Sequence, residues 1–170
     1  MHAEGGAATR LLRAVGGFLV RVPWPLVVVM WAGWAAVIFD LSSKRRPVVT
    51  SESPLWEFLS NLAHAPLFGV LALFAAALLM REQGGGWPRW RAGRAAAVVL
   101  ITLLYGLADE WHQSTVPGRD ASLMDVLTDT VAAVMVVWVV HGVGAGERAL
   151  LWRLVVGVLL CAAAALLACG

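Results

Sequence analysis

The chain has 170 residues, of which 60% are hydrophobic and only 14% are charged, and its formal net charge is +2. Soluble domains of this length are nearer half apolar and a quarter charged, so the composition excludes an ordinary soluble protein and indicates an integral membrane protein. A net charge this small, with basic residues that flank apolar runs, also argues against nucleic acid as a partner.

Residues 1–21 are expected to form a cytoplasmic or interfacial segment ahead of the first span. Arg10, Arg13 and Arg21 interrupt a weakly apolar stretch there, and no small-residue cleavage pattern precedes the next apolar run. The segment is therefore predicted to be an interfacial helix and not a cleaved signal. Residues 22–170 are predicted to form one transmembrane domain.

Five apolar runs follow, each close to the 20 or so residues that a helix needs to cross a bilayer. Residues with turn chemistry, mainly Gly, Pro and Ser, separate them. The predicted fold class is therefore all-α, an integral membrane bundle of five transmembrane helices. The runs cover residues 22–41, 58–80, 95–113, 123–141 and 150–169.

Basic residues predict how the spans are oriented. Nine lie on the face that holds the N-terminus and four on the opposite face, so the positive-inside rule places the N-terminus in the cytoplasm of a multi-pass protein of the inner (plasma) membrane. The four outer residues include Lys44–Arg46, a basic cluster that argues against this orientation. Such a cluster is typical of a loop that faces lipid headgroups, or of one that captures an anionic ligand. The nine inner residues are Arg10, Arg13, Arg21, Arg81, Arg89, Arg91, Arg94, Arg148 and Arg153.

The unusual polar residues all fall near the outer ends of the predicted spans. An acid at mid-bilayer costs about 2.5–3.5 kcal/mol on insertion scales, so such residues usually carry function. Because consecutive spans run in opposite directions, the polar ends of four spans meet at one depth, and we predict that they form one site. The residues are Asp40, Asn61, His64, Asp109, Glu110, His112, Gln113, Ser122, Asp125 and Asp129.

Helical spacing refines this prediction. Asp125 and Asp129 are four residues apart and share a helix face, with Ser122 one turn before them. Ser122 and Asp125 also fit a capping box, an alternative that cannot account for Asp129 about two turns into the span. Asp109 and Glu110 are adjacent, so they are not expected to point the same way.

Two chemical interpretations remain open for these residues. Carboxylates from several spans, together with an imidazole, could hold a divalent cation, or Glu110 could act as a general base. Arg119 could pair with the acids or bind phosphate. The alternative is a non-catalytic scaffold with interhelical hydrogen bonds of about 0.6–2 kcal/mol each. The candidate catalytic residues are Glu110, Asp109, His64, His112 and Asp125, and the candidate substrate-binding residues are Arg119, Gln113, Asn61, Ser122, Asp129 and Lys44.

The order of these residues resembles that of the VanZ-like family of small bacterial membrane proteins. Residues 109–113 (DEWHQ), the Pro117-Gly118-Arg119 turn, Ser122, Asp125 and Asp129 follow the family's D-E-x-x-Q, P-x-R, S-x-x-D and D/N order. The family's core motifs correspond to residues 39–141, which include His64. Asn61 and Ala65 stand where the family usually has a basic and an aromatic residue.

The resemblance implies an inner-membrane protein of the bacterial cell envelope, with a link to antibiotic resistance through a founding member associated with teicoplanin, a glycopeptide. The partner that it implies is a membrane lipid or a lipid-linked envelope precursor. A bundle this thin is also expected to be able to form a homo-oligomer.

Overall fold

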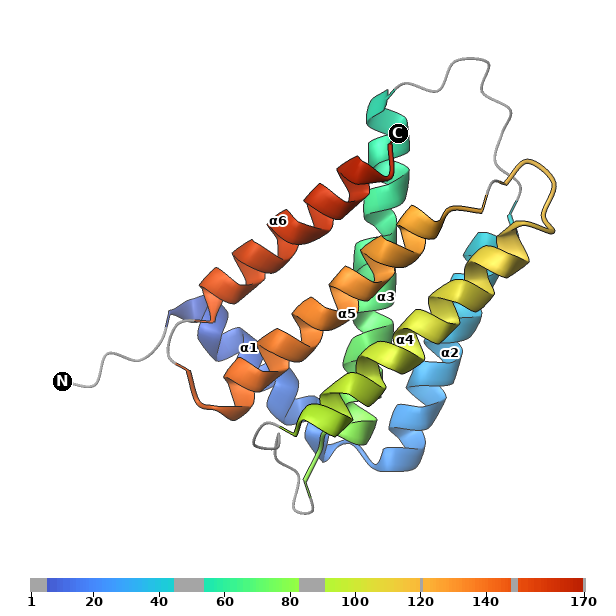
Figure 1. Ribbon diagram of the computed structural model, residues 1–170. Helices are drawn as coiled ribbons and strands as arrows, with labels where there is room; N and C mark the ends of the chain where they lie inside the picture. Colours follow the sequence, from blue (N-terminus) through green and yellow to red (C-terminus); the bar gives the residue numbers. More distant parts are fainter. Residues whose placement is uncertain (1–5, 45–53, 83–90, 120, 148–149, 170) are drawn as a thin grey trace.

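A computed structural model describes residues 6–44, 54–82, 91–119, 121–147 and 150–169, and all regular secondary structure in these residues is α-helical (Figure 1). The all-α prediction is confirmed. Arg45, Arg46, Arg89 and Arg148 of the charge analysis, and the first five residues of the predicted interfacial segment, lie outside the described residues. The helices are α1 (Ala7–Arg21), α2 (Trp24–Ser42), α3 (Pro54–Leu79), α4 (Ala92–Gln113), α5 (Leu123–Gly144) and α6 (Leu151–Leu167).

Four of these helices, α2 to α5, are long and apolar enough to cross a membrane, with 19 to 26 residues each. The chain is thus a multi-pass membrane protein by the length and composition of its helices. The fifth predicted span corresponds to α6, which has only 17 residues. At 1.5 Å per residue α6 is about 26 Å long, shorter than a hydrocarbon core of about 30 Å. The prediction of five spans is therefore supported for four of them.

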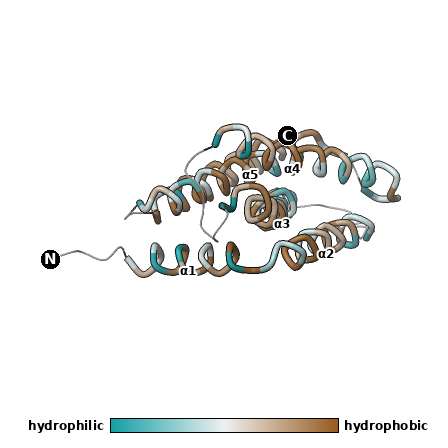
Figure 2. Tube along the Cα trace, turned by 90° about the horizontal axis from the view of Figure 1, so that it is seen from below, coloured by the Kyte–Doolittle hydropathy of each residue, from teal (hydrophilic) through white to brown (hydrophobic). Residues whose placement is uncertain are grey.

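Helix α3 is the centre of the bundle, because it contacts α2, α4, α5 and α6. Figure 2 shows it lying between α2 on one side and α4 and α5 on the other. Its alanines explain this position: Ala72, Ala75 and Ala76 are almost fully buried against Val98 of α4 and Ala133 of α5. Small side chains let membrane helices approach closely, so α3 packs against neighbours on several sides.

The outward-facing side chains are predominantly large and apolar. Leu104 of α4, Leu123 of α5 and Leu159 of α6 are more than half exposed. Water would disfavour such a surface, whereas lipid tails solvate it, since they are as apolar as leucine itself.

Helix α1 lies against the end of the bundle where α5 ends and α6 begins (Figure 1). The Arg13 guanidinium donates hydrogen bonds to the carbonyls of Gly146 and Glu147, and Thr9 Oγ1 accepts one from the backbone N–H of Leu150. These contacts tie the N-terminal helix to the junction of α5 and α6. The prediction that residues 1–21 lie at a membrane interface stays a prediction.

The alternating directions of the helices bring five helix ends together at the opposite end of the bundle. The C-terminal ends of α2, α4 and α6 meet there with the N-terminal ends of α3 and α5 (Figure 1). This end holds the buried polar residues described next.

Candidate functional site

His64 of α3 lies at the centre of the buried polar residues, with only 7% of its surface exposed. Its Nδ1 is 3.2 Å from Asp129 Oδ1, and its Nε2 is 3.8 Å from Asp125 Oδ2. Both acids come from α5, four residues apart, so one face of that helix presents them to the imidazole. The ring also stacks almost parallel to Phe68, one turn along α3.

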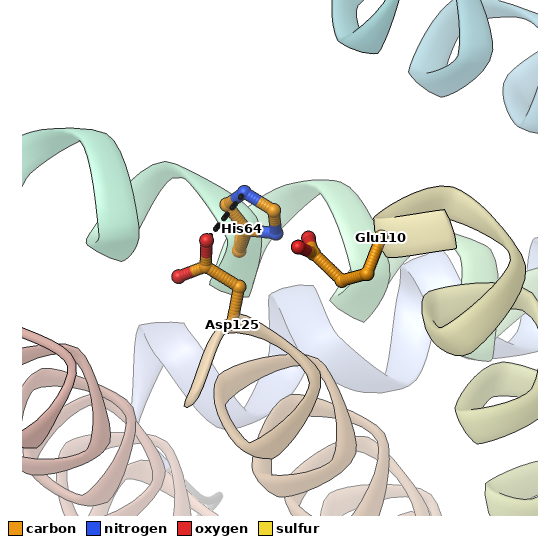
Figure 3. Close-up of side chains that lie close together, drawn as sticks. All are labelled: His64, Glu110 and Asp125. Atoms are coloured by element: carbon orange, nitrogen blue, oxygen red, sulfur yellow. Dashed lines mark ion pairs between the residues drawn. The ribbon is translucent and has the colours of Figure 1, made fainter. Parts of the chain in front are cut away.

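Glu110 of α4 completes a three-helix cluster. A ring nitrogen of His64 and one carboxylate oxygen each of Glu110 and Asp125 all lie within 4.8 Å of one another, and all three residues are buried. Figure 3 shows the two carboxylates directed toward the imidazole from different helices. We call His64, Glu110, Asp125 and Asp129 the His64 cluster.

Two neighbours hold the Glu110 carboxylate in place. Glu110 Oε1 accepts a hydrogen bond from Gln113 Nε2 at 3.1 Å, and Oε2 accepts one from the backbone N–H of Ser122 at 2.7 Å. Gln113 Nε2 also donates to Asp109 Oδ2 at 2.8 Å. Asp109 and Glu110 are adjacent in sequence, yet both are buried and both accept a hydrogen bond from Gln113. That residue lies one turn beyond both acids, within reach of each.

Ser122 acts as the N-cap of α5, and its Oγ accepts a hydrogen bond from the backbone N–H of Met124 at 3.2 Å. In a full capping box the acid at the third helical position, here Asp125, would accept the N–H of Ser122. Glu110 of α4 accepts that N–H instead. The Asp125 carboxylate therefore faces His64, so the capping alternative holds for Ser122 alone.

Arg119, in the turn between α4 and α5, ties that turn to the end of α2. Its guanidinium donates to the backbone carbonyls of Leu41 at 2.6 Å and Lys44 at 3.1 Å, and to Gln113 Oε1 at 3.2 Å. Since Gln113 in turn binds Asp109 and Glu110, one chain of hydrogen bonds runs from α2 to the His64 cluster.

Seven of the predicted site residues lie outside the four-residue His64 cluster. Four of them are in the hydrogen-bond network just described, and the side chains of the other three make their contacts elsewhere. His112 faces α2, where its ring stacks on Phe39 and its Nε2 lies 2.9 Å from Ser43 Oγ. Lys44 is exposed and pairs with Asp40 at 2.7 Å. Asn61 is buried but donates to Cys169 Sγ near the end of α6.

Gly106 of α4 is a site residue that the sequence analysis missed. A Cβ atom at this position would lie 2.9 Å from Asp129 Oδ2, so a glycine is needed for α4 to pass this close to α5. The available signal was its position one turn before Asp109 and Glu110. Phe68 was missed too, although it lies four residues after His64 and hence on the same face of α3.

Several buried carboxylate oxygens of the site have no hydrogen-bond partner among the described residues: Asp109 Oδ1, Asp125 Oδ1 and Asp129 Oδ2. A buried charge that lacks compensation is costly, and buried acids are normally paired, protonated or bound to a cation. The site thus concentrates three buried acids around one imidazole, with a fourth, Asp109, joined to Glu110 through Gln113. Part of the hydrogen-bonding capacity of these acids is not used by the described residues.

The site lies within the part of the chain that matches a known protein family. A family model described as VanZ/LLP1 matches residues 18–144, which include α2 to α5 and every residue of the His64 cluster. The chain is also 38% identical over 92 residues to the histidine protein kinase DivJ of Caulobacter vibrioides. That match covers 50% of this chain but only 15% of the kinase. No solved structure matches the chain.

Proposed function

The chain belongs to the VanZ/LLP1 family, and on that premise we propose that its buried polar site binds or modifies a lipid-linked or phosphate-bearing substrate of the bacterial cell envelope. The site would lie at the outer headgroup level of the inner membrane. The proposed biological consequence is a change in the envelope that contributes to resistance to glycopeptides such as teicoplanin.

The observation that carries this proposal is the convergence of His64, Glu110 and Asp125 from three membrane-spanning helices. Each acid placed deep in a bilayer costs about 2.5–3.5 kcal/mol, and the packing of small residues along α3 already holds the bundle together. Selection for stability alone would favour apolar side chains at these positions. Acids and an imidazole at one point are instead the groups that move protons or bind polar ligands.

The depth of the cluster suits a headgroup substrate. Asp129 lies six residues beyond Leu123, the first residue of α5, which is about 9 Å along the helix at 1.5 Å per residue. A phosphate or sugar of a lipid headgroup would have to reach about this depth to contact the cluster. In this proposal Glu110 and His64 contact the polar group of the substrate, Gln113 and Ser122 position Glu110, and Lys44 attracts anionic groups at the rim.

A pair of near-isosteric variants tests the proposal. Glu110→Gln and Asp125→Asn each remove a charge from the cluster with almost no change in shape. In a strain that lacks the native gene, both variants should lose teicoplanin tolerance and the associated lipid profile while reaching the membrane at normal levels. The matched control is Glu82→Gln, because Glu82 is an exposed acid beyond the C-terminal end of α3, away from the cluster. Full activity of both cluster variants would refute the proposed function.

The second candidate is a non-catalytic scaffold in which the same residues form a structural interhelical network. The hydrogen bonds from Arg119 to α2 and from Ser122 to Glu110 favour it, since they connect separate helices. On this alternative, loss of function should follow loss of thermal stability in detergent across the variants. A Glu110→Gln protein that melts like the wild type yet has no activity would exclude the scaffold.

A further inference from the structure

The His64 imidazole is held as a metal-binding histidine is usually held. Its Nδ1 lies 3.2 Å from a carboxylate oxygen of Asp129, whose surface is fully buried. If Nδ1–H donates to Asp129, the lone pair of Nε2 points toward Asp125 Oδ2, 3.8 Å away. This carboxylate–histidine arrangement sets the tautomer and the ring orientation at most histidine–metal sites.

Two acids lie close enough to the imidazole to provide oxygen ligands. The ligand atoms of His64, Glu110 and Asp125 lie within 4.8 Å of one another, whereas the ligands of a tetrahedral Zn²⁺ ion are about 3.4 Å apart at bond lengths near 2.1 Å. The difference is about 1.4 Å, so the ligand atoms would have to move together by about that distance when an ion binds. Figure 3 shows the two carboxylates on either side of the imidazole, each close to the ring.

An independent observation indicates a missing ligand. The Asp125 side chain is only 7% exposed, and its Oδ1 has no hydrogen-bond partner among the described residues. The two Glu110 oxygens accept hydrogen bonds from Gln113 and Ser122, which fixes the carboxylate while leaving each oxygen a lone pair. Buried carboxylates with this unused capacity beside an oriented imidazole need a counter-charge.

We propose that His64, Glu110 and Asp125 bind one divalent transition-metal ion, Zn²⁺ or Mn²⁺, and that Asp129 positions the His64 ring. The imidazole favours these ions over Mg²⁺ and Ca²⁺, which prefer oxygen ligands alone. With three protein ligands, the ion would keep an open position for water or for a substrate oxygen. This inference rests on the proposed function, because it assigns a cofactor to the same site.

Metal binding is tested on the full chain, purified in detergent and stripped with a chelator. Titration with Zn²⁺ alone should show one high-affinity ion per chain and raise the melting temperature. Mn²⁺ bound to the same preparation should show ¹⁴N coupling from one imidazole in pulsed electron paramagnetic resonance. Ca²⁺ and Mg²⁺ should bind at least 100-fold more weakly.

Variants locate the ion. Glu110→Gln and Asp125→Asn should each reduce Zn²⁺ affinity by 100-fold or more. Asp129→Asn should reduce it by about 10- to 100-fold and retain the ¹⁴N coupling, as expected for a residue that only positions the ligand. His141→Asn, which removes an imidazole near the other end of α5, should bind Zn²⁺ like the wild type. Size-exclusion profile and helical circular dichroism establish that each variant is folded.

The outcomes separate this inference from the proposed function. A folded wild-type chain without stoichiometric Zn²⁺ or Mn²⁺ binding, or with binding that survives both Glu110→Gln and Asp125→Asn, would overturn the metal site. If those variants nevertheless abolish teicoplanin tolerance, the proposed function stands without a metal. If the ion binds at the cluster but its loss leaves tolerance unchanged, the metal site stands and the proposed function fails.

Discussion

Gly106 faces the carboxylate of Asp129 across the contact between α4 and α5, and a Cβ atom there would lie 2.9 Å from Asp129 Oδ2. The carboxylate cannot retreat easily, because Asp129 is fully buried and bound to His64. Gly106→Ala is therefore expected to destabilise the protein by about 1–3 kcal/mol, the usual cost of overpacking. It should also lower Zn²⁺ affinity through the displaced His64 ring.

The control for this prediction is Gly93→Ala in the same helix, where nothing lies within 4 Å of the added Cβ. That variant should melt at the wild-type temperature or slightly above it, since alanine is the better helix former. The measurement is thermal unfolding in detergent by circular dichroism. Equal melting temperatures for the two variants would show that α4 can shift away from Asp129 at no cost.

The limits of prediction at this scale are clearest for the two histidines. The spacing of Asp125 and Asp129 predicts a shared face, and the structure has that face directed at His64. His112 has the same chemistry and adjoins two acids in sequence, yet it faces Phe39 of α2. Spacing gives the relative phase of residues on one helix. Which helix lies opposite each face depends on tertiary packing, and that information is absent from the local pattern.

At the scale of elements, Arg119 connects α2 to the turn between α4 and α5 through three hydrogen bonds to Leu41, Lys44 and Gln113. Arg119→Lys retains the positive charge, but a single ammonium cannot match the planar fork of the guanidinium. The loss of one or two of these bonds should cost about 1–3 kcal/mol and lower the melting temperature in detergent. If the arginine serves only to attract phosphate, the lysine variant should keep both its stability and its activity.

Lys44→Gln provides the comparison for Arg119→Lys. The Lys44 ammonium is 62% exposed and pairs only with the equally exposed Asp40 among the contacts described above. Exposed ion pairs contribute about 0–1 kcal/mol, so this variant should unfold at nearly the wild-type temperature. The backbone carbonyl of Lys44 that accepts from Arg119 remains in place.

The helix boundaries show why elements are only partly predictable from hydropathy. Helix α3 begins at Pro54 and α4 at Ala92, four and three residues before the apolar runs beginning at 58 and 95. Backbone hydrogen bonding continues past the lipid core, where polar residues such as Glu57 and Arg94 are tolerated at helix ends. An apolar run indicates which part of a helix lies in lipid. It therefore predicts the position of a span well, but not the residues at which the helix begins and ends. In α6 the opposite occurs, because the apolar run extends beyond the helix.

At the scale of the whole molecule, the meeting of polar groups at one end follows from the alternating direction of successive helices, which the order of apolar runs already predicts. The central place of α3 does not follow from that order. It depends on the buried alanines that let α2, α4 and α5 approach α3. A run of alanines alone does not say on how many sides a helix is covered. The sequence therefore predicts at which end of the bundle the polar residues meet. It does not predict that α3, α4 and α5 bring their side chains together there, which only the structure shows.

The side of the membrane on which the His64 cluster lies decides which substrates can reach it. Nine basic residues at one end and four at the other predict that the cluster faces outward, away from the cytoplasm. Thr115, in the turn between α4 and α5, and Ala145, just beyond the C-terminal end of α5, are both exposed. They lie on either side of α5, so cysteines placed there report its orientation whether or not α6 crosses the membrane. The background for this test replaces Cys161 and Cys169 with alanine and should give no labelling.

In intact cells a membrane-impermeant maleimide should label Thr115→Cys and not Ala145→Cys, and permeabilised cells should label both. The expected result puts His64 and Glu110 within reach of envelope precursors on the outer leaflet. The reverse pattern would place the same acids at the cytoplasmic leaflet, where a glycopeptide acting outside the cell cannot meet them. The chemistry of the cluster would then need a substrate on the inner leaflet, and the link to teicoplanin would have to be indirect.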